Sequence, residues 1–187
     1  MRVDVAQKRG AFIGKINSLL LQEFHSVTPN VFFKLMNTYA LSIYGSNTWD
    51  IFSTDCEKLY ASFNVTIRNV LKIDSQTHRY FIEPLSGCTH VKTSIASRFA
   101  TFHYSLINSK KMSVRFLARL AESDQRTVMG RTLSSLLSIC KLKSEELSRL
   151  NAGLVKKNMV FSRPPAEEEW RIPLGQELLQ LRDICVA

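Results

Sequence analysis

The chain has 187 residues, of which 45% are hydrophobic and 22% are charged, as is ordinary for a globular protein with a sizeable core. It contains no run of about 18 uncharged apolar residues, and its start lacks the apolar core of a signal peptide. The sequence therefore predicts an intracellular protein, nuclear or cytoplasmic, with no membrane as partner.

Charge is unevenly distributed along the chain. The formal net charge is +9, and residues 76–163 hold 15 Lys and Arg against 5 Asp and Glu. Such a concentration favours a polyanionic partner, because basic side chains neutralise phosphates and release counterions. A solvated basic surface that only improves solubility is the alternative.

Two helices are predicted at the start of the chain. Apolar residues at helical spacing indicate one over residues 4–24, in which Gly10 and Gly14 cost stability but permit the close approach of another helix or backbone. Thr28-Pro29 begins the second, as an N-cap followed by proline at the first helical position. This helix is expected to end at Gly45, a residue that tolerates the left-handed conformation.

The stretch Tyr39-Ala-Leu-Ser-Ile-Tyr-Gly-Ser-Asn-Thr-Trp49 predicts an aromatic turn that pins the helices on either side of it. A third helix begins near Thr54, where Glu57 completes a capping-box pattern. Three helices joined by short turns indicate a bundle over residues 1–74. At its centre the sequence predicts mutual contact between four side chains, those of Tyr44, Trp49, Leu59 and Phe63.

Further packed helices are predicted over residues 75–151, and the expected fold is all-α. A short helix over 78–83 should stop at Pro84 and Gly87, and later starts are expected at Thr89, Ser113, Thr127 and Ser144. Residues 152–187 are predicted to hold a linker, 152–172, and a last short helix, 173–186.

The helix that Ser113 begins is predicted to be amphipathic. Val114, Leu117 and Leu120/Ala121 are expected inside, with Arg115 and Arg119 on the outside. Glu122 stands three residues after Arg119, a spacing at which the two charges can neutralise each other.

Several motifs occur in a fixed order. The turn Tyr44-Gly-x-x-x-Trp49 precedes a helix that ends in Arg68-Asn-Val-Leu-Lys-Ile73, and Thr77-His-Arg-Tyr-Phe-Ile-Glu83 and Ser113-Val-Arg-Phe-Leu-Ala-Arg119 follow. Over roughly residues 1–140 this order resembles the thumb and post-thumb region, after the palm, of non-LTR (LINE-type) retrotransposon reverse transcriptases. Asn47 stands where that family often has an acidic residue. The resemblance implies a module that holds a template–primer duplex while the palm performs the chemistry.

The sequence lacks the residues that a polymerase palm uses for catalysis. A polymerase palm holds two metals with closely placed aspartates, but this chain has no Asp-Asp pair. It also has no Gly-rich phosphate loop, and Cys56, Cys88, Cys140 and Cys185 are too widely spaced for a zinc or disulfide framework. We expect buried, reduced thiols, no cofactor, no metal site and no activity from this chain alone.

The predicted partner is nucleic acid, as RNA, DNA or a hybrid duplex, together with a palm domain if the chain is part of a longer protein. The predicted nucleic-acid-binding residues are basic and lie on the helices of the middle region: Arg68, Lys72, His78, Arg79, Lys92, Arg98, Lys110, Lys111, Arg115 and Arg119. Two alternatives are a helical protein-interaction domain that binds acidic partners and a non-functional reading frame derived from a retroelement. An upstream palm would separate the first interpretation from the last.

Overall fold

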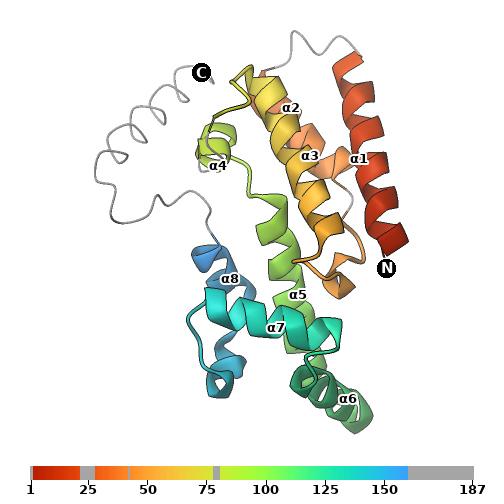
Figure 1. The fold of residues 1–187 in the computed structure, drawn as a ribbon, viewed down its shortest axis with the longest axis vertical. Helices are drawn as coiled ribbons and strands as arrows, with labels where there is room; N and C mark the ends of the chain where they lie inside the picture. Colours follow the sequence, from red (N-terminus) through yellow and green to blue (C-terminus); the bar gives the residue numbers. More distant parts are fainter. Residues whose placement is uncertain (1, 22–27, 42, 78–80, 160–187) are drawn as a thin grey trace, which may run out of the picture. The chain divides into compact units, whose positions relative to one another are not determined.

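The computed structural model describes residues 2–21, 28–41, 43–77 and 81–159 (Figure 1). All regular structure in these ranges is helical and no strand occurs in them, which confirms the predicted all-α fold. The described residues form two compact units. We call residues 2–41 and 58–90 the N-terminal unit, and residues 43–57 and 91–159 the C-terminal unit.

The two units interleave along the chain, whereas the sequence predicts the consecutive regions 1–74, 75–151 and 152–187. The difference arises because the turn over residues 46–48 packs against a helix that begins at Val91, far away in sequence. Helical periodicity reports which residues face a core, but it carries no information about which distant segment completes that core.

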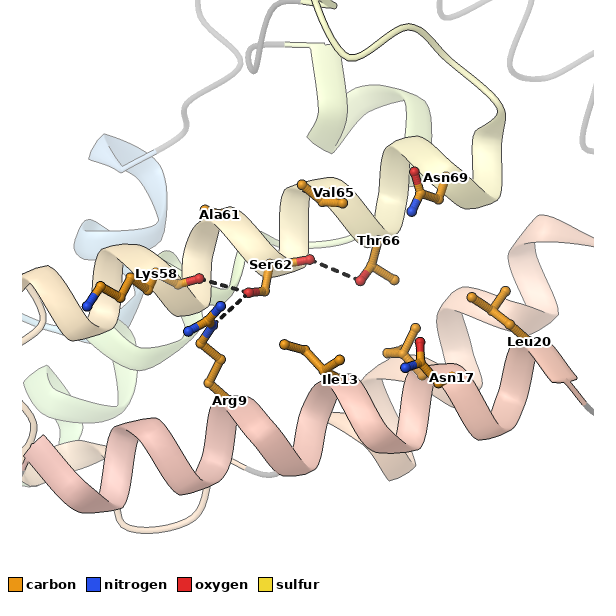
Figure 2. A pocket seen from close by; sticks show the side chains of 11 residues that line it. Arg9, Ile13, Asn17, Leu20, Lys58, Ala61, Ser62, Val65, Thr66 and Asn69 are labelled. Carbon is orange, nitrogen blue, oxygen red and sulfur yellow. Dashed lines mark hydrogen bonds between the residues drawn. The ribbon is translucent and has the colours of Figure 1, made fainter.

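The N-terminal unit contains α1 (Arg2–Leu21), α2 (Pro29–Leu35), a π-helical turn η2 (Met36–Ala40), residues 58–71 of α3 (Thr54–Leu71), and α4 (Ile82–Ser86). Helices α1 and α3 lie side by side (Figures 1 and 2). The rings of Phe12 and Phe63 meet between them with centroids 6.4 Å apart. Both rings are buried, as are Ile16 and Ile67 one helical turn further along.

Three local predictions for this unit need correction. The second helix ends at Ala40, not Gly45, because the π-helical turn leads into non-helical backbone at Leu41. Pro84 lies inside α4, in the first turn, where a missing N–H costs no helical hydrogen bond; Gly87, with φ +63°, ends the helix as predicted. Gly10 and Gly14 are exposed, and a Cβ atom added to either would meet no other atom within 4 Å, so no close approach by the described residues uses them.

The C-terminal unit contains η3 (Ser46–Thr48), the first turn of α3, α5 (Val91–Ile107), α6 (Met112–Ser123), α7 (Val128–Ile139), η5 (Ser144–Arg149) and α8 (Ala152–Asn158). The start of the predicted linker is therefore helical. The Asn151 side chain accepts a hydrogen bond from the Leu154 N–H and caps α8, which packs against α5. The rest of the predicted linker and the helix predicted at 173–186 lie outside the described residues.

The aromatic turn follows the prediction only in part. Gly45 adopts the left-handed conformation with φ +79°, and Trp49 is 1% exposed in the C-terminal unit. Tyr39 and Tyr44 are 65% and 84% exposed, so the predicted contact of Tyr44 with a bundle core is wrong. Because regular helix stops at Leu35 and the π-helical turn changes the register, neither tyrosine stays on the buried face.

The cysteines within the described residues behave as predicted. Cys56, Cys88 and Cys140 are buried free thiols, and burial raises the pKa of the Cys88 and Cys140 thiols above the ordinary value. A raised pKa keeps a thiol protonated and unreactive at neutral pH. Cys185 lies outside the described residues.

Candidate nucleic-acid interface

Helix α6 and the residues before it carry four of the ten predicted binding residues. Lys110, Lys111, Arg115 and Arg119 are all exposed, and the last three recur every four residues along one side of the helix. None of the four forms an ion pair within the described part of the chain. Arg115 donates through Nη1 to the Ser109 carbonyl oxygen at 2.9 Å, which places its guanidinium beside the start of the helix. The geometry is that of a solvent-facing basic row.

The acid expected to neutralise this row has another partner. Glu122 Oε1 lies 2.6 Å from Nε2 of His103, a side chain of α5 that is 1% exposed. The predicted Arg119–Glu122 pair is therefore wrong. The spacing permits it, but Glu122 is on the flank of α6 that faces α5, and a buried imidazole nitrogen needs a hydrogen-bond partner more than an exposed guanidinium does.

Helix α6 is also rotated relative to the prediction. Leu117 and Leu120, expected inside, are 63% and 51% exposed, and Ala118 is the buried residue of the helix. Alanine on the packed face lets α6 approach α5 closely, and the larger apolar side chains are left in solvent. The exposed surface of α6 is therefore basic on one side and apolar on the other.

A tight turn sets the position of α6 against α7. The Thr127 side chain caps α7 by accepting from the Gly130 N–H at 2.9 Å, and its hydroxyl lies 2.6 Å from the Ala121 carbonyl oxygen of α6. Gly130 is buried, and a Cβ atom there would lie 2.4 Å from the Asp124 carbonyl oxygen. The two helices approach this closely only because residue 130 has no side chain.

The two other predicted residues of the C-terminal unit take part in packing. Lys92 Nζ lies 2.7 Å from Glu57 Oε1 and 5.0 Å from the centroid of the Phe52 ring, and its side chain is 14% exposed. Arg98 donates through Nη1 to the Ile43 carbonyl oxygen at 3.1 Å. Both side chains link α5 to the segment 43–57 through these contacts. They are therefore engaged within the protein, whereas the basic side chains of the row on α6 face solvent.

In the N-terminal unit, the Arg68 guanidinium donates to the Thr77 carbonyl oxygen at 2.9 Å and joins the end of α3 to the following loop. Lys72 is exposed, with φ +53° just after the helix. His78 and Arg79 lie outside the described residues. The structure thus gathers Lys110, Lys111, Arg115 and Arg119 on α6 and the residues just before it, in the C-terminal unit, whereas Arg68 and Lys72 belong to the N-terminal unit.

The described residues also form surface hollows that were not predicted from the sequence, and two of them are relevant here. One is a groove of about 420 Å³ between α1 and α3, where Arg9 Nε donates to Ser62 Oγ at 3.0 Å (Figure 2). The other is a cleft of about 870 Å³ between α6, α7 and η5, with Arg119 and Lys143 among its lining residues. The position of a hollow depends on how the helices pack, which the sequence does not show directly. What the sequence offered for the groove was apolar residues, such as Ile13 and Val65, at positions that are exposed in the structure.

Within the described ranges, no three His, Cys, Asp or Glu side chains gather closely enough to hold a metal ion. No helix in those ranges is long and apolar enough to cross a membrane.

Comparison with known proteins adds no family. No protein-family model, no curated protein and no solved structure matches this chain. The resemblance to reverse transcriptases therefore rests on the ordered motifs alone and stays a prediction.

Proposed function

We propose that this chain is a non-catalytic module of an intracellular protein that holds nucleic acid, corresponding to the thumb and post-thumb region of a non-LTR reverse transcriptase. In that setting a palm domain would precede it and carry the polymerase chemistry. The observation that supports binding most strongly is the exposed basic row on α6, whose neighbouring acid, Glu122, is engaged by His103. Lys110, Lys111, Arg115 and Arg119 are the proposed phosphate contacts.

Contacts of this kind act through charge. Lysine and arginine side chains neutralise backbone phosphates, and the released counterions supply the free energy of binding. Such contacts position a backbone without reading its bases, so nucleic acids of different sequence should bind with similar affinity. An RNA–DNA hybrid would be preferred only if its 2′-hydroxyl groups are also contacted.

Replacing Arg115 and Arg119 together by alanine is expected to weaken binding and flatten its dependence on salt. Neutralisation of about four to six phosphates gives a log–log slope of about −3 to −5, and losing two contacts should flatten it by up to about two units. The measurement is a titration of labelled hybrid duplex with the full chain across a salt series.

The matched control is Lys156→Ala with Lys157→Ala, which removes the same charge from exposed positions on α8. A slope that flattens equally for both pairs would mean that net charge, and not the row on α6, drives binding. The absence of saturable binding of any nucleic acid at low salt, duplex or single-stranded, would contradict the proposal itself.

The isolated chain is expected to show no nucleotide incorporation and no nuclease cleavage with magnesium or manganese. Both reactions need carboxylates that hold the metal ions, and the sequence places no two aspartates side by side. A primer-extension assay checks this expectation. Extension that a single Asp→Asn substitution abolishes would reveal a metal site and overturn the non-catalytic assignment.

A further inference from the structure

A second row of side chains lies next to the basic row on α6. Each basic residue is followed directly by a large apolar one, in the pairs Lys111-Met112, Arg115-Phe116 and Arg119-Leu120. Because successive residues of a helix are about 100° apart around its axis, the three apolar side chains form a row of their own beside the basic one. The two rows share the exposed surface of α6.

The side chains of the apolar row are large, and more than half of the surface of each is exposed to solvent. Met112, Phe116 and Leu120 are 79%, 62% and 51% exposed, and Leu117 beside them is 63% exposed. Phosphate contacts alone would leave these side chains in water, at a cost in hydrophobic free energy. A ligand that fits both rows must carry negative charge along one edge and apolar surface along the other.

Single-stranded nucleic acid has this chemistry. In a duplex the faces of the bases are stacked inside, whereas in a single strand they are accessible and stack on aromatic side chains while basic residues follow the phosphates. Phe116 supplies the ring, with Met112 and Leu120 one helical turn before and after it.

We infer that α6 binds an unpaired stretch of nucleic acid, with phosphates along Lys111, Arg115 and Arg119 and a base stacked on Phe116. The inference rests on the proposed function and specifies its ligand. A second copy of this chain that used the same face of α6 fits this surface less well, because two basic rows would meet and repel each other. Glu122 would not neutralise them, since it is paired with His103.

The test compares a labelled 12-nucleotide oligothymidylate with a duplex of equal length, titrated with the full chain at fixed low salt. Phe116→Ala is expected to weaken binding of the single strand by about 5- to 150-fold, the usual effect of losing one stacked base. Duplex affinity and the salt slope should stay unchanged, since the basic row is intact. Phe116→Trp should bind the single strand at least as tightly as the unmodified chain.

Leu117→Ala is the matched control, since Leu117 is equally exposed but lies outside the apolar row. The inference is overturned if Phe116→Ala and Leu117→Ala weaken binding of the single strand equally, or if Phe116→Leu binds the single strand as tightly as the unmodified chain. It is also overturned if the only effect of Phe116→Ala is to abolish self-association of the chain, measured by sedimentation. In those cases duplex binding that depends on Arg115 and Arg119 would leave the proposed function standing. Failure of both ligands to bind at low salt would remove the proposed function as well.

Discussion

Replacing Trp49 by alanine should lower the free energy of unfolding by about 3–5 kcal/mol, the range for a buried large aromatic side chain. Trp49 is 1% exposed and follows a turn that packs against α5, close in sequence to the fully buried Ile51. Removing the indole would leave a cavity that a turn fixed by the left-handed Gly45 can fill only in part. Urea denaturation followed by far-ultraviolet circular dichroism measures the change.

Tyr44→Ala is the control, because Tyr44 is also a large aromatic residue of the same turn but is 84% exposed. Its effect should stay within about 0.5 kcal/mol. If Trp49→Ala lowers the free energy of unfolding by less than about 1 kcal/mol, the indole ring is not buried as it is in the structure.

Gly130→Ala should destabilise the C-terminal unit by about 1–3 kcal/mol, or more if the turn cannot move. The added Cβ would lie 2.4 Å from the Asp124 carbonyl oxygen, 2.9 Å from the Asp124 carbonyl carbon and 3.1 Å from the Ala121 carbonyl oxygen, and all three are backbone atoms. Backbone cannot rotate away as a flexible side chain can, so α6 and α7 would have to separate. Thermal unfolding monitored by circular dichroism reports the loss.

The matched control is Gly10→Ala on α1, where a Cβ would meet nothing within 4 Å. Here the substitution should stabilise the chain by up to about 1 kcal/mol, since alanine is the better helix former. Equal effects at the two positions would show that Gly130 matters for helix propensity alone and not for the approach of the two helices.

The helices were predicted well from the sequence where short-range signals set them. Thr127 caps α7 as expected, α3 begins at Thr54, and Gly87 ends α4. Each of these signals acts within about four residues, through a cap, a periodic apolar face or a left-handed C-terminal residue. The same signals could not show that the π-helical turn at Met36–Ala40 would move Tyr44 away from a core.

The sequence predicted which basic residues the candidate interface contains, but not which face of α6 would meet solvent. The basic residues of α6 were identified, yet the rotation that buries Ala118 and exposes Leu117 depends on how closely α5 approaches. Likewise, the pairing of Glu122 with His103 joins residues 19 positions apart, beyond the reach of helical spacing. Which face of α6 meets solvent is a tertiary property, and the exposed apolar row follows from it.

The interleaved C-terminal unit has a consequence for the order in which the chain can fold. Residues 43–57 are synthesised before α5, and at about 5–20 residues per second the wait until residue 107 is also synthesised lasts about 3–10 s. During that time the packing partner of the Trp49 turn is absent. A premature stop codon between residues 58 and 90 would make the wait permanent, and such a product should be recognised by chaperones or aggregate through its uncovered tryptophan turn.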